Sequence, residues 1–378
     1  MLDNKIRVLY VVENTSFGGG ERGFGQLSTA INRNRFQPLI AAHPGGQLED
    51  IAQNRGVKFF PLDMNRKFNL KTLSAISKII NEYKIDIVHS MGARADFFTR
   101  IAARNILSAK VICTIAMFVE GFDVNALRKA LYKFADRYSS RFVSHYIAVS
   151  KALKQRLIQE RKIAEEKIAV IYNGVELDRY NPDRFNSNGF RKSLVIDDDC
   201  KIVGSIGRLV YQKGFRYLIE AAKILHQKED KLKIVIVGDG PEKKKLKRMA
   251  QTAGILDKCV FAGQRFDIPQ ILSEFDIFAL PSVLEGFPRV VIEAMAMGKP
   301  IVATDIDGVR EELTHNRTGI IVPPRNPVAL AEGIACLIND RRLADQFGSE
   351  ARKDAGLRFD LKQTVSNVEK LYESIYYL

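Results

Sequence analysis

The sequence predicts an α/β protein with two domains, each built on a doubly wound parallel sheet. Three observations support this prediction. The chain has 378 residues, which is longer than one ordinary hydrophobic core supports. Short apolar runs alternate with segments of helical periodicity along its whole length. A polar stretch, 179–200, separates two halves in which this alternation occurs.

In the first half, strands are predicted at 5–12, 38–42, 58–61, 85–90, 111–115 and 146–150, and helices at 24–31, 48–54, 70–83, 95–106 and 125–142. Residues 167–175 end this half with an Asn-Gly turn signal. Gly18, Gly19 and Gly20 follow the first strand. Because glycine lets backbone N–H groups approach a ligand closely, we expect them to form a loop facing a site at the carboxyl end of that strand.

The helix expected at 125–142 combines apolar and basic residues. Apolar residues recur along one side of it at helical spacing: Leu127, Leu131, Phe134, Tyr138 and Phe142. Arg and Lys residues stand between them. We expect a domain helix that packs its apolar face inward and leaves its charges in water. The alternative is a basic amphipathic helix that lies on an anionic lipid surface.

The second half repeats the alternation. Strands are predicted within 202–209, 233–241, 260–265, 276–280, 301–305 and, as an edge strand, 319–323. Helices are predicted at 218–225, 290–297, 328–338, 340–357 and 361–377. The last helix carries its apolar residues on one face.

The stretch 281–300 joins a buried strand to a helix through the loop 285–288, and Gly298 ends that helix. The free N–H groups and the dipole at the start of a helix favour an anion such as phosphate. Glu285 and Glu293 bracket this point, and carboxylates there are suited to accept hydrogen bonds from sugar hydroxyls. The pattern favours a nucleotide-sugar pocket, with an ordinary βα turn as the alternative.

Two cations follow the first strand of the second half. Arg208 comes directly after the strand and Gly207, and Lys213 lies in the loop that follows. Cations at the carboxyl end of a strand are well placed to neutralise a diphosphate. The alternative is solvated surface charge, which fits less well because Arg208 directly follows a buried strand.

Composition limits the class of protein. The net charge of +14 favours an anionic partner, such as nucleic acid, an anionic membrane or a phosphorylated substrate. The four cysteines are scattered without metal-ligand spacing, which fits a reducing cytosol. No apolar run approaches the roughly 20 residues of a membrane span. The amino terminus has no signal-peptide pattern.

Two segments contain the Asp-x-Asp pattern, which can bind a divalent metal together with a sugar nucleotide. They are Asp197-Asp198-Asp199, in the polar stretch, and Asp305-Ile306-Asp307, after a predicted strand. Neither has a third ligand nearby in the sequence, and we expect no metal site.

Several motifs in this order resemble the GT-B retaining glycosyltransferases of family 4, also called group 1. They span nearly the whole chain: Gly18-Gly19-Gly20-Glu21, Ala148-Val149-Ser150-Lys151, Asn173-Gly174-Val175-Glu176, Gly207-Arg208-Leu209, Gln212-Lys213-Gly214, Gly238-Asp239-Gly240-Pro241, Pro281-Ser282, Glu285 to Glu293, and Gly319. The two glutamates separated by seven residues, with Gly-Phe-Pro after the first, are the most specific of these.

The resemblance implies two Rossmann-like, doubly wound parallel-sheet domains facing across a cleft, with the C-terminal helix crossing back to the first domain. We expect an acceptor-binding domain at 1–178 with the returning helix 361–378. A linker at 179–200 and a nucleotide-sugar-binding domain at 201–360 complete the chain.

The resemblance also implies site residues. Arg208 and Lys213 would hold the diphosphate, and Glu285 would face the donor sugar. The other donor-binding residues would be Gly19, Gly20, Gly207, Gly238, Gly263, Arg265, Gly286, Phe287, Pro288, Arg289, Val290 and Glu293. Among these, Glu293 would bond the ribose hydroxyls and Gly263 to Arg265 would lie near the base. Family members commonly carry a His where Ala116 stands here, and we expect His89 to be a core histidine.

The implied function is retaining, metal-independent transfer of a hexose-type sugar from a nucleoside-diphosphate sugar, with UDP preferred over GDP or ADP and no cofactor. The acceptor would be a glycan or a lipid-linked saccharide in surface polysaccharide or glycolipid biosynthesis. We expect a cytoplasmic protein with peripheral contact to an anionic membrane through its basic first domain. Alternatives are an inactive glycan- or membrane-binding relative, suggested by Ala116, and a sugar-nucleotide epimerase. No nucleic-acid-binding motif accompanies the charge.

Overall fold

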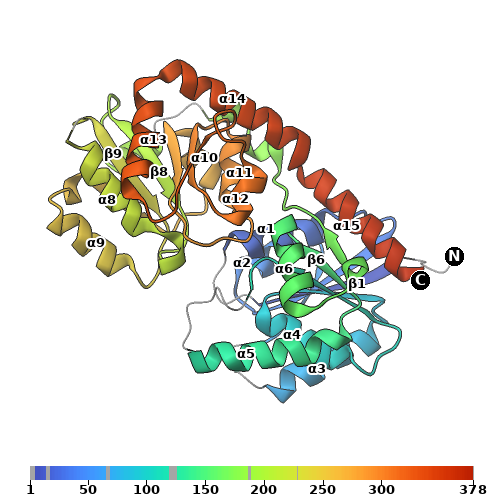
Figure 1. Ribbon diagram of the computed structural model, residues 1–378. Helices are drawn as coiled ribbons and strands as arrows, with labels where there is room; N and C mark the ends of the chain where they lie inside the picture. Colours follow the sequence, from blue (N-terminus) through green and yellow to red (C-terminus); the bar gives the residue numbers. More distant parts are fainter. Residues whose placement is uncertain are drawn as a thin grey trace. The chain divides into compact units, whose positions relative to one another are not determined.

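The computed structural model describes residues 5–13, 18–64, 69–118, 126–185, 189–227 and 229–377. The chain forms two compact units, which are drawn in Figure 1. Unit 1 comprises Met1–Gly174 and Leu361–Leu378, and unit 2 comprises Val175–Asp360. The chain therefore passes from one unit to the other twice, once after Gly174 and once after Asp360.

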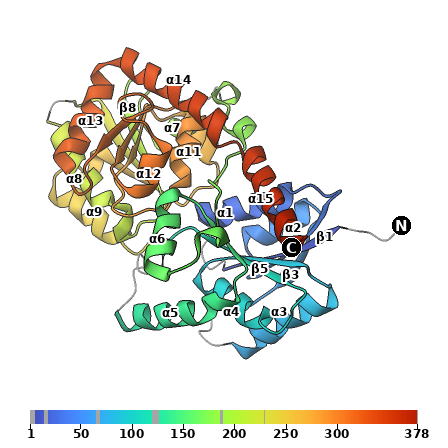
Figure 2. The same ribbon diagram turned by 45° about the vertical axis from the view of Figure 1, so that its right-hand side comes forward.

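Unit 1 is a parallel sheet covered by helices. Its strands are β1 (Ile6–Val12), β2 (Phe36–Ala42), β3 (Lys58–Pro61), β4 (Ile87–Met91), β5 (Lys110–Ile115), β6 (His145–Ala148) and β7 (Ile168–Val170), in the order β3-β2-β1-β4-β5-β6-β7. Its helices are α1 (Gly19–Ala30), α2 (Gln47–Asn54), α3 (Leu70–Glu82), α4 (Ala93–Ala103), α5 (Ala126–Ser139), α6 (Lys151–Arg161) and α15 (Leu361–Tyr376). Helices α3, α4 and α5 lie side by side on one face, and α1, α2 and α15 cover the other (Figures 1 and 2).

The centre of the unit 1 sheet is apolar on both faces, as expected for a parallel sheet between two helical layers. Strand β1 pairs with β2 and β4, so that Leu9 lies opposite Leu39 and Val88. The core extends from Tyr10 on β1 to Tyr372 on α15. The C-terminal helix is therefore an integral part of this unit.

The structure corrects the expectation for the glycine loop. Gly19 and Gly20 form the first turn of α1, and only Gly18 precedes the helix. The Glu21 carboxylate accepts a hydrogen bond from the Gly18 N–H at 3.0 Å, which caps the helix start. The backbone of Gly19 and Gly20 is thus fixed in a helix N-terminus and does not form a loop.

The expectation of an inward apolar face on helix 125–142 is wrong. Leu127, Leu131, Phe134 and Tyr138 on α5 are all exposed. The helix begins at Ala126, and Asn125 lies outside the described residues. Amphipathic spacing identifies the residues that share a helix face, but it does not reveal which face contacts the domain.

Unit 2 has the same architecture. Its strands are β8 (Lys201–Ile206), β9 (Leu232–Val237), β10 (Cys259–Gly263), β11 (Ile277–Leu280), β12 (Ile301–Thr304) and β13 (Ile320–Val322), in the order β10-β9-β8-β11-β12-β13. Its helices are α7 (Gly189–Ser193), α8 (Phe215–Leu225), α9 (Lys243–Thr252), α10 (Ile268–Ser273), α11 (Arg289–Ala296), α12 (Asp307–Glu312), α13 (Pro327–Asn339) and α14 (Arg341–Arg358). Strand β13 is an edge strand, as predicted. Helices α8 and α13 pack together against the core, and α11 packs on α12 and α14 (Figure 1).

The stretch 179–200, expected as a linker, belongs to unit 2 and carries the short helix α7. Phe190 of this helix is buried and packs edge-on against Phe275, with ring centroids 6.3 Å apart. The Arg191 guanidinium donates to the Asp276 carboxylate at 3.1 Å. The Glu274 carboxylate also accepts from the N–H groups of Phe190 and Arg191, both at 2.8 Å, so apolar, ionic and hydrogen-bond contacts attach this polar stretch to the chain just before β11.

Candidate active site

The strand order of unit 2 defines where its site lies. Because β9 and β12 flank the central pair β8 and β11, the chain leaves these two strands toward opposite faces of the sheet. Ligands of doubly wound sheets bind at such a switch point, outside the carboxyl ends of the strands. The loops after β8 and β11 meet there, because the Val283 N–H donates to the Gln212 carbonyl at 2.7 Å.

Glycines allow the loops around this switch point to approach closely. Gly214 has a positive φ of 65°, and a Cβ there would lie 2.0 Å from the carbonyl oxygen of Pro281. Gly238 has φ of 138°, and a Cβ there would lie 1.9 Å from the carbonyl oxygen of Gly207. The Gly238 N–H also donates to the Gly263 carbonyl at 2.7 Å. These contacts bring the ends of β8, β9, β10 and β11 together, and they require glycine.

The two predicted cations, Arg208 and Lys213, both lie at this switch point, but their side chains differ in exposure and pairing. Arg208 is exposed, and its side chain has no hydrogen-bond partner among the described residues. The Lys213 ammonium is hydrogen-bonded to the Glu285 carboxylate, which also accepts from the Ser282 hydroxyl at 2.9 Å. Charge-assisted bonds of this kind fix the lysine and the glutamate relative to each other. Glu285 thus joins the loop after β11 to the loop after β8.

The start of α11 contains a buried ion pair. The Arg289 Nε lies 3.4 Å from Glu293 Oε1, and each side chain is 5% exposed. Pro288 precedes the helix without a side-chain cap. The ring of Phe287 packs against Phe359, with centroids 5.6 Å apart. Glu293, the predicted ribose ligand, is therefore held by a cation one helical turn earlier, and the ring of Phe287 is engaged in packing against Phe359.

Other predicted residues lie around this group. Val290 is half-buried in the first turn of α11, and Gly286 lies so close to Gly308 that a Cβ on Gly308 would be 2.6 Å from the Gly286 carbonyl oxygen. Arg265, after β10, is paired with Asp267 through bonds of 2.8 and 2.5 Å. Arg265 is thus held by Asp267 beside the end of β10.

The sequence analysis did not identify a buried carboxyl group near Glu285. Glu312, the last residue of α12, is fully buried, and neither of its carboxylate oxygens has a hydrogen-bond partner among the described residues. Burial raises the pKa of Glu312 well above its usual value, and the nearby charge of Glu285 raises it further. Burial therefore favours the protonated form of this carboxyl group. No sequence pattern marked this residue, because its chemistry follows from burial.

Unit 1 has a switch point of its own, between β1 and β4. Arg94, at the start of α4, donates from Nε to Glu13 Oε1 at 2.6 Å, and its backbone N–H donates to Glu13 Oε2 at 2.8 Å. Gly92 has φ of 105°, and a Cβ there would lie 2.9 Å from the Glu13 Cβ. The sequence analysis missed this pair as well, although Glu13 directly follows the first predicted strand.

His89 is a core histidine, as expected. Its Nδ1 lies 2.5 Å from the Tyr372 hydroxyl and its Nε2 lies 2.6 Å from the Thr114 hydroxyl. Burial lowers the pKa of His89 from 6.5 to about 3, so the imidazole is neutral. Ala116 lies just beyond the end of β5.

The two acidic segments with the Asp-x-Asp pattern differ in their surroundings. Side-chain ligand atoms of Asp197, Asp199 and Cys200 lie within 4.8 Å of one another, so the first segment has the third ligand that we had judged absent. However, Asp199 is exposed and forms an ion pair with Lys231. In the second segment, Asp305 is paired with Arg310 through bonds of 2.5 and 2.9 Å. Lysine or arginine therefore already neutralises a carboxylate in each segment.

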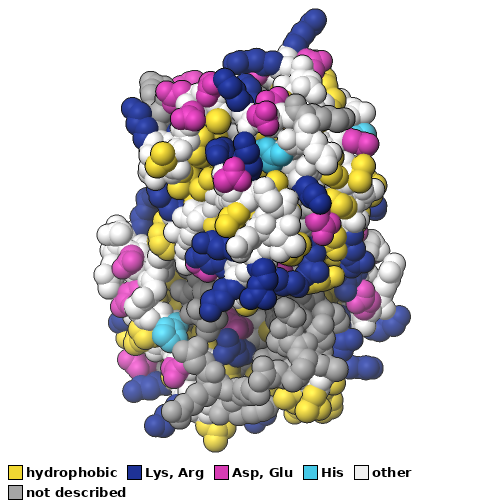
Figure 3. Space-filling view, turned by 90° about the vertical axis from the view of Figure 1, so that its left-hand side faces the viewer, with side chains coloured by type: hydrophobic (Ala, Val, Ile, Leu, Met, Phe, Trp, Pro, Cys, Tyr) yellow, Lys and Arg dark blue, Asp and Glu magenta, His cyan; other side chains and the backbone are white. Residues whose placement is uncertain are grey.

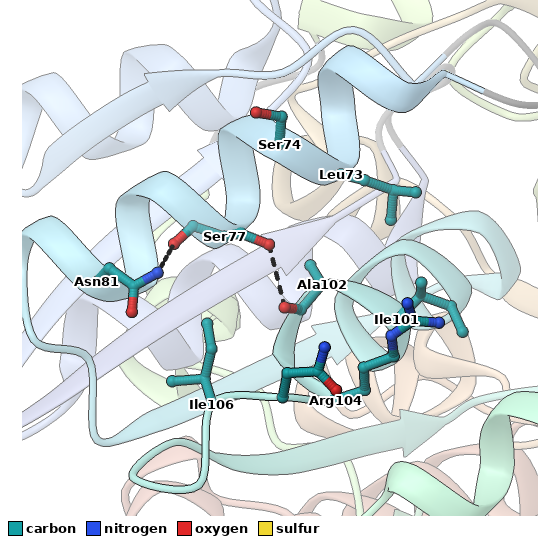
Figure 4. Close-up of a pocket in the computed structure, with 9 residues that line it drawn as sticks. Leu73, Ser74, Ser77, Asn81, Ile101, Ala102, Arg104 and Ile106 are labelled. Carbon is teal, nitrogen blue, oxygen red and sulfur yellow. Dashed lines mark hydrogen bonds between the residues drawn. The ribbon is translucent and has the colours of Figure 1, made fainter.

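A cavity of about 480 Å³ lies between α3 and α4 in unit 1 (Figure 4). Ser77 on its wall donates to the Ala102 carbonyl at 3.0 Å, and Asn81 donates to the Ser77 carbonyl. These polar groups satisfy one another, and the cavity contains none of the predicted site residues.

The surface is rich in cations. Lys and Arg side chains are numerous on the face that Figure 3 draws. This agrees with the net charge of +14. Within the described residues, no helix is both long and apolar enough to cross a lipid bilayer.

Comparisons with known proteins identify the family. The family of glycosyl transferases group 1 matches residues 186–354, and Glycosyltransferase Family 4 matches residues 17–179. An uncharacterized glycosyltransferase of Haemophilus influenzae is 35% identical over 348 residues, which cover 91% of this chain and 93% of that protein. The chain belongs to the group 1 glycosyltransferases.

Two further proteins similar to this glycosyltransferase are a relative whose name states its substrates and a solved structure with the same fold. An Escherichia coli protein named UDP-Gal:alpha-D-GlcNAc-diphosphoundecaprenol alpha-1,3-galactosyltransferase is 27% identical and covers 98% of this chain and 97% of its own. The crystal structure of HepE of Anabaena in complex with UDP and glucose superposes with a TM-score of 0.84. It is 25% identical and covers 98% of this chain and 100% of its own. The fold is GT-B, as predicted.

Proposed function

We propose that this glycosyltransferase moves a hexose-type sugar from a nucleoside-diphosphate sugar, UDP-linked in preference to GDP or ADP, to a lipid-linked or glycan acceptor in surface polysaccharide or glycolipid biosynthesis. The observation that supports this most directly is the arrangement at the β8–β11 switch point. Arg208 is free there, and beside it lies the Lys213–Glu285 pair. An exposed, uncompensated arginine next to a positioned lysine suits a diphosphate.

The reaction follows from these groups. The acceptor hydroxyl oxygen forms a bond to the anomeric carbon, and the bond from that carbon to the diphosphate oxygen breaks. The hydroxyl proton passes to the departing phosphate oxygen, so the nucleoside diphosphate leaves with its charge balanced. Arg208 and Lys213 stabilise the negative charge that develops on the leaving group, and therefore no metal and no cofactor is needed.

Glu285 has two tasks in this proposal. Its carboxylate accepts a hydrogen bond from the Lys213 ammonium and another from the Ser282 hydroxyl, which fixes the lysine. When a diphosphate binds, the lysine exchanges part of this contact for phosphate oxygens, and Glu285 accepts hydroxyl groups of the donor sugar. Attack and departure on the same face of the sugar give retention of configuration.

Relatives support the choice of donor and acceptor. HepE was crystallised with UDP-glucose, and the Escherichia coli relative is named for transfer from UDP-Gal to a diphosphoundecaprenol-linked sugar. A Campylobacter jejuni relative, 28% identical over 363 residues, is named for a diphospho-undecaprenol acceptor as well. Because such acceptors reside in a bilayer, we further propose that the protein works in peripheral contact with an anionic membrane.

Thermal stabilisation by nucleotides tests the donor site. A ligand that binds only the folded state raises the melting temperature by mass action. We expect UDP to raise it in the presence of EDTA and to do so more than GDP, ADP or CMP. Arg208→Ala should abolish the shift, whereas Arg248→Ala, an exposed arginine on α9, should leave it unchanged. A shift that needs added metal, or that survives Arg208→Ala, would contradict the proposed mechanism.

Product analysis tests the reaction itself. We expect transfer from a UDP-hexose to a diphosphoundecaprenol-linked saccharide, with the anomeric configuration of the donor kept, as read by NMR of the product. Inversion would exclude same-face attack. UDP binding without transfer to any lipid-linked or free glycan acceptor would favour the inactive relative suggested by Ala116.

A further inference from the structure

Helix α5 carries four large apolar side chains on its outside. Leu127 is 80% exposed, Leu131 45%, Phe134 71% and Tyr138 43%. Their spacing of four, three and four residues puts them in one stripe along the helix. Single exposed apolar residues are common on protein surfaces, but a stripe of large ones indicates an interaction site.

The opposite side of α5 is held to unit 1 by polar groups. Asp136 accepts a hydrogen bond from the buried guanidinium of Arg100 on α4 at 2.7 Å. The hydroxyl of Ser139, which is also buried, lies 3.2 Å from the same guanidinium nitrogen. Asp136 lies about half a turn away from the stripe, because each residue advances the helix by about 100°. The ion pair therefore fixes which face of α5 looks outward.

Cations accompany the stripe. Lys133, Arg137 and Arg141 are exposed along α5 and the turn that follows it. The Arg141 guanidinium lies over the Tyr138 ring, 4.0 Å from its centroid. Asp136 is the sole acidic residue between 126 and 142 in the sequence, and its carboxylate faces inward to Arg100. The outward face of α5 thus combines apolar side chains with positive charge.

We propose that the outward face of α5, formed by Leu127, Leu131, Phe134 and Tyr138 with Arg137 and Arg141 at its edge, docks on the surface of an anionic lipid bilayer. Apolar side chains enter the boundary between headgroups and acyl chains, and cations contact lipid phosphates. A second copy of the chain is a poorer occupant, since a two-fold interface on this face would bring like charges together. This inference rests on the proposed lipid-linked acceptor and assigns the surface that would bring the enzyme to it.

Flotation with lipid vesicles tests the assignment. We expect the protein to float with vesicles of phosphatidylcholine containing phosphatidylglycerol, and to bind pure phosphatidylcholine at least about 10-fold less. The variant Leu131→Ser/Phe134→Ser should lose at least about 10-fold in binding, and Arg137→Gln/Arg141→Gln should lose a similar factor at low salt. The control Val328→Ser/Leu357→Ser removes exposed apolar residues of unit 2 and should bind as the wild type does.

The same samples separate this inference from the proposed function. All of these side chains are exposed, so the variants should keep the wild-type melting temperature and its shift with UDP. Equal vesicle binding by wild type and the Leu131→Ser/Phe134→Ser variant, or equal binding to neutral and anionic vesicles, would overturn the assignment. Absence of vesicle binding together with a dimer that needs Phe134 would identify a second copy as the occupant. If the protein binds vesicles but no nucleotide raises its melting temperature, the membrane-docking face is supported and the proposed donor site is rejected.

Discussion

Lys213 and Glu285 are hydrogen-bonded through their charged groups although 72 positions separate them in the sequence. The loop after β8 supplies the lysine, and the loop after β11 supplies the glutamate. Because these loops leave the sheet on either side of its switch point, the pair spans the place where the diphosphate is proposed to bind.

Removing the lysine should affect catalysis more than folding. We expect Lys213→Met to lower kcat/KM by about 100- to 1000-fold, because a cation that stabilises the leaving group is lost. Steady-state transfer from a UDP-hexose measures this loss. Lys223→Met, on the exposed side of α8, is the matched control and should keep full activity. A Lys213→Met enzyme with near wild-type kcat/KM would show that the lysine is a structural partner of Glu285 alone.

Two glycines with positive φ offer a paired test of loop contact. Gly254, with φ of 72°, has open space where a Cβ would stand, whereas a Cβ on Gly238 would meet the Gly207 carbonyl. We expect Gly254→Ala to cost about 1–2 kcal/mol through backbone strain, and Gly238→Ala about 3 kcal/mol or more because the clash is added. Urea unfolding measures both. If both variants lose the same free energy of unfolding, the loops after β8 and β9 can move apart to accommodate the Cβ at position 238 without further cost.

The buried carboxyl of Glu312 should make the protein less stable as the pH rises. Its pKa is raised above the ordinary 4.5, so the folded state keeps a proton that the unfolded chain releases above that pH. We expect Glu312→Gln to increase the free energy of unfolding by about 1–3 kcal/mol at pH 8, with a smaller gain near pH 4.5.

Urea unfolding of the wild type and Glu312→Gln at pH 4.5 and pH 8 gives the comparison. Glu332→Gln, an exposed glutamate on α13, serves as the control and should show no such dependence on pH. A Glu312→Gln protein that is less stable than the wild type at pH 8 would mean that the carboxyl group is ionised and paired in solution.

His89 should contribute the opposite pH dependence. Its pKa is lowered from 6.5 to about 3, so the folded protein favours the neutral imidazole. The resulting stability is fully present above pH 6.5 and is lost as the pH falls toward about 3. We expect His89→Gln to cost about 1–3 kcal/mol at pH 7 and to flatten the decline between pH 6.5 and pH 4. Thermal unfolding measured between pH 6.5 and pH 4 gives the pH dependence of stability. If His89→Gln loses stability with falling pH as steeply as the wild type does, other titrating groups cause the loss.

The elements that the sequence predicted well are those with strong local signals. The buried run before Pro281 and the helix ended by Gly298 both lie where they were expected, as β11 and α11. Glu285 and Lys213 were nominated because a family motif contains them, and the structure brings them into contact. Helical or strand periodicity and turn signals depend on residues that are neighbours in the sequence, and they can therefore be recognised without a structure.

Long-range packing is what the sequence concealed. The stripe on α5 has the spacing of a core face, but the side chains are exposed because the Asp136–Arg100 contact turns the opposite side of the helix inward. Glu312 looks like one of two ordinary helix glutamates until its burial is known. Glu13 and Arg94 lie 81 positions apart, and neither is unusual alone. Each of these features depends on a partner distant in the sequence.

The return of α15 to unit 1 has a consequence for dissecting the protein. Tyr372 fills the core beside His89, and Glu369 accepts a hydrogen bond from the Asn32 N–H at 2.7 Å. Unit 2 is one uninterrupted piece of chain, Val175–Asp360, so a single fragment contains all of it. Unit 1 has no such single fragment, because a gene truncated after Gly174 omits a helix of its core. An independently folding N-terminal half would have to be a fusion that splices the last 18 residues back on, with a short connector in place of the whole of unit 2.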